Sequence, residues 1–189
     1  ICFFAYGKLG LGIASAISAV IIISHFTFGI FLASKKISFK VLLESTPVYA
    51  VLIAVTFLYY NIQPPKFIEN TAFLLAYSTI ALILMSLGIA LTKLKVFSFK
   101  NAIISTFARL ILGPLVGLGI IYFFDLKGVP AGVFLIQCSM PSAILTYLVG
   151  SMYSSKKVVN SIASTIVVST VVSFLTVPII VFISIKYFF

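Results

Sequence analysis

The chain has 189 residues, of which 62% are hydrophobic and only 8% are charged. Soluble domains carry roughly 25% charged residues, so a soluble fold could not hide this much apolar surface. The formal net charge of +10 does not indicate a nucleic-acid partner, because the lysines lie singly or in small groups between apolar runs. The runs show no period-two alternation, and an open sheet edge cannot sit in lipid. We therefore predict an all-α membrane protein whose surroundings are the lipid bilayer.

Six apolar segments are long enough to cross a bilayer, which takes about 20 apolar residues in a helix. They cover about residues 13–34, 41–60, 71–92, 102–124, 129–153 and 158–185. Residues 1–12 look like the tail of a seventh span, so we expect the true N-terminus to lie upstream of Ile1. The connectors are too short to hold a soluble domain, which predicts one polytopic helical bundle.

The distribution of lysines predicts the orientation. If each span crosses once, one side collects Lys35, Lys36, Lys40, Lys93, Lys95, Lys100, Lys156 and Lys157. The other side holds Lys66, Lys127 and Lys186, accompanied by Glu69 and Asp125. Because cytoplasmic connectors carry the excess of cations, the first side should be cytoplasmic and the C-terminus extracytoplasmic, in the cell membrane.

Two groups of helix-breaking residues interrupt the apolar runs. The first is the glycine-rich stretch at residues 7–12, and the second surrounds Pro141 in the middle of its span. Such residues leave backbone groups exposed, which lipid tolerates only where protein or an aqueous cavity meets them. Each interruption is followed by one further span. This predicts an inverted repeat, with residues 1–34 ending a first unit (a broken helix plus one span) and residues 41–189 forming a second unit of five helices.

Several stretches resemble the auxin efflux carrier family. Gln-Cys-Ser-Met-Pro-Ser-Ala at residues 137–143 is similar to the Met-Pro-Thr-Ala type crossing in the broken helix of the family's second half. Residues 84–91 and 108–115 are similar to its Leu-x-x-x-Gly-x-x-Leu and Arg-Leu-x-x-x-Pro-Leu stretches, and residues 164–165 and 169–178 to its last helix. The resemblance implies a carrier of about ten helices, with a fold shared with bile-acid sodium symporters in which two discontinuous helices cross at mid-membrane.

The first interruption departs from the family pattern Asn-x-Gly-x-x-Gly-x-Pro. Gly7 and Gly10 keep two of its positions, whereas Ala5 and Gly12 stand where the family has Asn and Pro. In the second half, many members have Asn shortly after the Pro, where this chain has Thr146.

Broken helices place half-helix N-termini inside the membrane, where unpaired N–H groups and the positive dipole end favour an anion. We therefore predict that the carboxylate of a small organic anion binds where the two interruptions face each other. The expected binding residues are Gly10, Leu11, Gly12, Ser139, Met140, Pro141, Ser142, Ala143 and Thr146. The alternative is a proline kink packed between helices without a ligand.

Three other polar residues lie within apolar runs, and each has two interpretations. Arg109 either snorkels toward the Lys-rich surface or acts as an anion partner or structural lock. Lys8 either attracts an anion or reaches solvent. His25 is either a proton relay or a hydrogen-bonded contact between helices.

These features predict a secondary transporter of small organic anions rather than an enzyme. The sequence has no carboxylate pair, Cys/His pair or metal-spaced cluster, so we expect neither a catalytic site nor a metal or cofactor. A passive anion channel and a non-transporting membrane subunit are the alternatives. Channels need a repeated filter or charged ring, whereas paired breakers in one chain suit alternating access. The oligomeric state stays open, and a homodimer is compatible with this plan.

Overall fold

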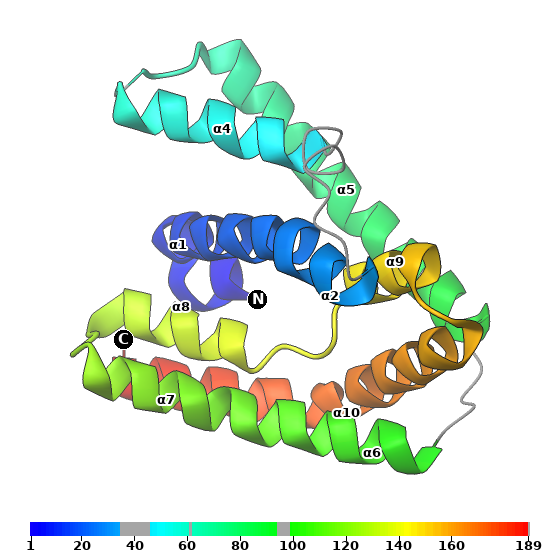
Figure 1. Ribbon diagram of the computed structural model, residues 1–189. Coiled ribbons are helices and arrows are strands. Elements are labelled where there is room, and N and C mark those ends of the chain that lie inside the picture. The colour runs from blue at the N-terminus through cyan, green and yellow to red at the C-terminus, as the bar shows by residue number, and fades with distance from the viewer. Residues whose placement is uncertain (35–45, 61, 94–98, 189) are drawn as a thin grey trace. The chain divides into compact units, whose positions relative to one another are not determined.

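The computed structural model describes residues 1–34, 46–60, 62–93 and 99–188, which are helical apart from short turns and connectors (Figure 1). No strand occurs within these ranges, so the prediction of an all-α fold is confirmed. The chain divides into two compact units, Ile1–Ser38 with Val96–Phe189, and Phe39–Lys95. This division follows packing rather than sequence symmetry, and the inverted repeat stays a prediction.

The smaller unit contains α4 (Thr46–Tyr59) and α5 (Lys66–Lys93). Helix α5 begins earlier than expected, because Pro65 accepts the first helical hydrogen bonds from Ile68 and Glu69 at 2.9 and 3.2 Å. A glutamate in the first turn also suits the positive end of the helix dipole. Residues 41–45 of the expected span lie outside the described ranges.

The larger unit contains the remaining described helices. They are α1 (Cys2–Ser24), η1 (His25–Gly29), α2 (Ile30–Ser34), α6 (Phe99–Phe107), η2 (Ala108–Leu112), α7 (Gly113–Phe123), α8 (Gly128–Cys138), α9 (Ile144–Tyr153) and α10 (Lys156–Phe188). The elements η1 and η2 are π-helical turns inside longer helices. Three described helices, Cys2–Ser24, Phe99–Phe123 and Lys156–Phe188, are long and apolar enough to cross a membrane, while α8 and α9 are shorter apolar helices.

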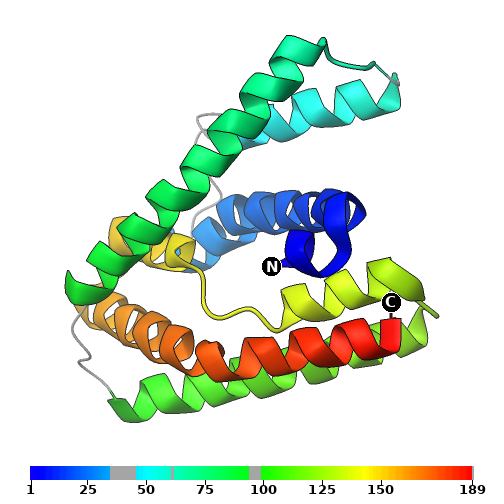
Figure 2. The same ribbon diagram turned by 180° about the vertical axis from the view of Figure 1, so that it is seen from behind.

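Helix α8 lies at the centre of this unit and packs against α1, α7 and α10 (Figure 2). Its Ala131, Val133, Leu135 and Ile136 are at most 1% exposed. Because α8 has 11 residues, it is only about 16 Å long and cannot cross a hydrocarbon core of about 30 Å alone. A short helix packed against three others therefore brings its C-terminal end into the interior of the unit.

The first interruption is a sharp fold at Gly7, the one residue of α1 with non-helical backbone angles (φ 62°, ψ −150°). A Cβ atom on Gly10 would lie 2.5 Å from the Cβ of Tyr6 and 2.6 Å from the carbonyl oxygen of Cys2. Residues eight apart in a straight helix are separated by about 12 Å. The two arms of α1 therefore fold back on each other at Gly7.

The chain reversal at Gly7 shows that the predicted bounds of the first two segments were wrong. The expectation was a tail at residues 1–12 and a span at 13–34, but the helix runs from Lys8 through α1, η1 and α2 to Ser34. That length is about 40 Å at about 1.5 Å per residue, enough for a whole span. Only Gly7 leaves the helix, because glycine alone adopts these angles without strain.

The second interruption lies where it was predicted. Helix α8 ends at Cys138, α9 begins at Ile144, and the backbone of residues 139–143 is not helical (Figure 1). Pro141 explains the stop, since it lacks a backbone N–H and pushes the preceding residue out of the α region.

The orientation stays a prediction. Lys35, Lys36, Lys40 and Lys95, which carry half of the predicted cytoplasmic charge, lie outside the described residues.

Candidate functional site

The break at residues 139–143 is anchored on α8 and α10. The buried Ser139 donates its Oγ–H to the carbonyl of Leu135 at 2.7 Å, which satisfies one of the free carbonyls at the end of α8. The N–H of Ser142 donates to Oγ of Ser169 on α10 at 3.3 Å. The protein thus holds both ends of the unwound segment while the helix is interrupted.

Helix α7 fixes the position of the end of α8 through two glycines. A Cβ on Gly113 would clash with the carbonyl oxygen of Cys138, and one on Gly117 would lie 3.0 Å from the Cβ of Cys138. Small residues four apart let helices approach closely in membranes. Sequence reasoning missed this contact, although the Gly-x-x-x-Gly spacing at residues 113–117 was its signal.

Helix α1 and its continuation η1 contact the chain on both sides of the break. Gln137 donates its Nε2–H to the carbonyl of Ala14 and to Oγ of Ser18, both at 3.3 Å. Beyond the break, Oγ1 of Thr146 lies 3.2 Å from Nε2 of His25. These contacts join two segments more than 100 residues apart in the sequence.

The glycine-rich residues predicted to face the break lie nearer the fold at Gly7. Gly10 is buried against Cys2 and Tyr6, whereas Leu11 and Gly12 are exposed. Among the described residues, hydrogen bonds from α1 and η1 to α8 and α9 run through Ala14, Ser18 and His25 instead. Of the predicted residues, the structure brings Ser139, Met140, Ser142 and Thr146 together around the break. Pro141 and Ala143 lie within it.

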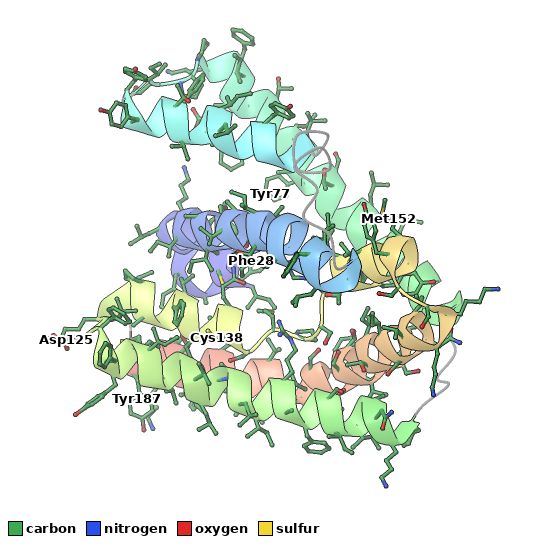
Figure 3. The ribbon with its side chains drawn as sticks, in the orientation of Figure 1. Phe28, Tyr77, Asp125, Cys138, Met152 and Tyr187 are labelled. Atoms are coloured by element: carbon green, nitrogen blue, oxygen red, sulfur yellow. The ribbon has the colours of Figure 1, made fainter. Side chains whose placement is uncertain are left out.

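An open cavity of about 950 Å³ begins where α8 ends and extends between α1, η2 and α7. Apolar side chains form most of its wall, among them Ile17, Ile21 and Phe134, while Arg109 and Gln137 are its larger polar members. Figure 3 labels Cys138, which also lines the cavity. The cavity therefore combines apolar surface with one cation and one amide beside the break.

Arg109 and His25 both sit in π-helical turns, η2 and η1. Such turns insert an extra residue into a helix and occur frequently at functional sites. Within the described part of the larger unit the one acidic residue is Asp125, and it pairs with Lys127 at 2.7 Å. Arg109 is exposed to the cavity and has no carboxylate beside it in that part of the chain. This geometry agrees with the anion-partner interpretation of Arg109.

A metal is not suggested by the residues that the structure describes. No three His, Cys, Asp or Glu side chains in residues 1–34, 46–60, 62–93 and 99–188 lie close enough to hold an ion.

Comparison with known proteins gives a family and two relatives. A family model described as "Membrane transport protein" matches residues 13–181. The chain is 33% identical over 114 residues to an uncharacterized transporter of Methanocaldococcus jannaschii, which covers 60% of this chain and 36% of that protein. It is 29% identical over 134 residues to an uncharacterized transporter of Methanothermobacter thermautotrophicus, which covers 70% of this chain and 43% of that protein. No solved structure matches.

The matches thus span about two fifths of the length of these relatives. The matched residues 13–181 include the break, the cavity and His25. The chain therefore belongs to the membrane transport protein family, the auxin efflux carrier family that its sequence resembles.

Proposed function

We propose that this membrane transporter is a secondary carrier of small organic anions, whose carboxylate binds at the break between α8 and α9. The observation that carries the proposal is the unwound segment at residues 139–143, held beside a cavity that contains Arg109 and Gln137. Interrupted backbone at membrane depth is tolerated where protein or a cavity meets it. Here Ser169 meets the N–H of Ser142, the cavity begins at the end of α8, and the family's transport role makes a substrate the natural occupant of that cavity.

The charge of the substrate follows from the groups around the break. Helix α9 starts at Ile144 without a side-chain cap from Ala143. The first N–H groups of a helix have no partner within the helix, and its dipole attracts negative charge. Arg109 adds a full positive charge on the cavity side. Both features favour an anion over a cation or a neutral solute.

The cavity fits a small molecule with a carbon skeleton. Its volume of about 950 Å³ lies within the range of about 300–1,000 Å³ that is common for ligand pockets. Apolar residues such as Val20, Leu112 and Val116 would contact the skeleton, while Arg109 would orient the carboxylate.

The residues of the proposed site are those gathered at the break. Ser139, Met140, Pro141, Ser142 and Ala143 form the interrupted segment, and Thr146 follows it in the first turn of α9. Ala14, Ser18 and His25 hydrogen-bond the chain on either side of the break, and we propose these residues in place of Gly10, Leu11 and Gly12. We place the carrier in the cell membrane with its C-terminus outside, and a homodimer remains compatible with the site.

Uptake by the purified protein in proteoliposomes tests this proposal, with radiolabelled malonate, succinate and lactate as probes. Saturable uptake that is stimulated by the same carboxylate inside the vesicle is expected of a carrier. An ohmic current would instead indicate a passive channel, and the absence of flux would indicate a non-transporting subunit.

Two variants locate the site. We expect Pro141→Ala and Ser142→Ala to lower uptake at least tenfold, on the order of the effect of misplacing a positioning group. Pro178→Ala and Ser78→Ala are matched controls, since Pro178 is exposed within α10 and the Ser78 hydroxyl bonds its own helix at 3.0 Å. Normal uptake by both break variants at normal expression would remove the site from this segment.

A further inference from the structure

His25 occupies a defined hydrogen-bonding position beside the break. It is the first residue of the π-helical turn η1, and both nitrogen atoms of its ring have an oxygen within reach. Nδ1 lies 3.3 Å from the carbonyl oxygen of Ile21, and Nε2 lies 3.2 Å from Oγ1 of Thr146. The imidazole therefore bridges its own helix and the first turn of α9.

The two partners determine where the hydrogen atoms lie. A carbonyl oxygen only accepts hydrogen bonds, so Nδ1 must carry a hydrogen in either protonation state. In the neutral ring Nε2 is then an acceptor, and the hydroxyl of Thr146 donates to it. When Nε2 is protonated it becomes a donor, so the oxygen of Thr146 must accept. The hydrogen of that hydroxyl is then released to point elsewhere.

No carboxylate lies on the described helices that pack against His25, so a protonated His25 would have no acidic partner there. The elements packed against η1 are α1, α2 and α9. Their titratable or charged side chains are Cys2, Tyr6 and Lys8 on α1, and Tyr147 and Tyr153 on α9, with none on α2. Lys8 lies about 25 Å farther along the helix. None of these groups is a carboxylate.

We propose that His25 and Thr146 form a proton-binding pair that couples proton uptake to carboxylate binding at the break. This inference rests on the proposed function, and it names the coupling ion. Water on the side of entry supplies the proton to Nε2. The imidazolium then provides the counter-charge for the carboxylate, and the released hydroxyl of Thr146 donates a hydrogen bond to it. On the other side the carboxylate leaves, the proton returns to water, and Thr146 again donates to Nε2.

Coupling of this kind is reciprocal. A proton that raises the affinity for the carboxylate requires the carboxylate to raise the affinity for the proton by the same factor. Imidazole is the side chain that changes charge between about pH 5 and about pH 8. Proton and carboxylate therefore travel in the same direction, and a monocarboxylate crosses without net charge.

Proton movement and pH dependence test the proposal in proteoliposomes that contain a trapped pH indicator. Addition of malonate, succinate or lactate should acidify the lumen, by one proton per transported anion, relative to protein-free vesicles. At subsaturating carboxylate, initial uptake should fall as the pH of the entry side rises, because less of the protein carries the proton.

Substitutions separate coupling from a merely structural contact. His25→Gln keeps hydrogen-bonding groups but does not titrate, so its residual uptake should be independent of pH and should not acidify the lumen. Thr146→Ser should retain coupling, whereas Thr146→Val should lower the number of protons moved per carboxylate. Thr165→Val is the matched control, because the Thr165 hydroxyl bonds Ser161 of its own helix at 3.0 Å. It should behave like wild type.

The possible failures are distinguishable. Carboxylate uptake by wild type without acidification would overturn the proton pair and leave the carrier function intact, even if His25→Gln did not fold. If uptake by His25→Gln depended on pH as uptake by wild type does, the proton pair would likewise be overturned and the carrier function left intact. No uptake of the three probes by wild type would overturn both proposals.

Discussion

The two interruptions of helical structure look alike in the sequence but differ in how the chain continues after them. At Gly7 a single residue leaves the helix, and the next turn packs Gly10 directly against Cys2 and Tyr6. At residues 139–143 the chain stays unwound over five positions and is held by separate helices. An interruption closed by its own two arms is a structural fold. At residues 139–143, by contrast, other helices hold the end of α8 and the start of α9 apart. We expect an interruption of this kind to leave polar groups available to a ligand.

The contrast also appears in the buried polar groups. Beside the fold, the hydroxyl of Tyr6 lies 2.7 Å from Oγ of Ser184, which in turn donates to the carbonyl of Gly132 at 2.9 Å. These two hydrogen bonds tie the N-terminal arm of α1 to α10 and α8, and they pair the hydroxyl groups of Tyr6 and Ser184 with protein atoms. At the break, Arg109 instead borders an open cavity, with no carboxylate beside it in the described part of the larger unit.

The largest expected effect tests whether α7 holds the end of α8 in place. Gly113→Val would drive a side chain into the backbone of Cys138, which cannot move aside without displacing the break. Overpacking of this kind costs about 1–3 kcal/mol and sometimes more, and we expect the upper part of that range in the free energy of unfolding in detergent.

Gly119→Val is the matched control on the same helix, because a Cβ there meets nothing within 4 Å. Equal loss of stability in both variants would mean that contact with the end of α8 does not determine the effect.

A second prediction sharpens the interpretation of the first interruption as a fold. Gly7→Ala should lower the free energy of unfolding by about 1–3 kcal/mol, since its backbone angles are strained for any residue with a Cβ. Gly12→Ala should leave stability unchanged or raise it by up to about 1 kcal/mol, because Gly12 lies within a helix beside open space. If both alanines had the same effect, the special role of Gly7 would be refuted.

The smallest expected effect concerns the link between α1 and the break. Gln137→Leu removes the two hydrogen bonds to Ala14 and Ser18, each worth about 1 kcal/mol at most in net stability. A double-mutant cycle with Ser18→Ala should give a coupling energy of about 0.5–1 kcal/mol in the free energy of unfolding. Strictly additive losses would show that the two side chains do not interact in solution.

The sequence predicted those features that depend on local chemistry. Long apolar runs determine helices in a membrane, so the fold class was predictable, and Pro141 ends α8 wherever its neighbours lie. Whether a glycine cluster reverses a helix sharply at one residue or unwinds it over several depends instead on what packs against it. Nothing local to Gly10 reveals that Cys2 returns to lie beside it, which is why the sequence predicted an interruption over residues 7–12 rather than at Gly7 alone.

The candidate site was predictable in part. Residues 139–143 and Thr146 were identified from their chain neighbours, but their partners on α1 and η1 lie more than 100 residues away in the sequence. The π-helical turns that hold His25 and Arg109 have no sequence signal of their own. The glycines at residues 113 and 117 did carry a recognisable spacing, and only their partner, Cys138, required the structure.

The central claim is that the unwound segment between α8 and α9 contacts the transported carboxylate. Its most direct test is the labelling of Ser142→Cys by a water-soluble thiol reagent, in a background where Cys2 and Cys138 are replaced by alanine. We expect malonate, succinate or lactate to slow labelling at residue 142 in proportion to occupancy. Labelling of Lys127→Cys, on an exposed connector, should not change. Equal labelling rates at residue 142 with and without a carboxylate that the Ser142→Cys protein itself transports would contradict the account.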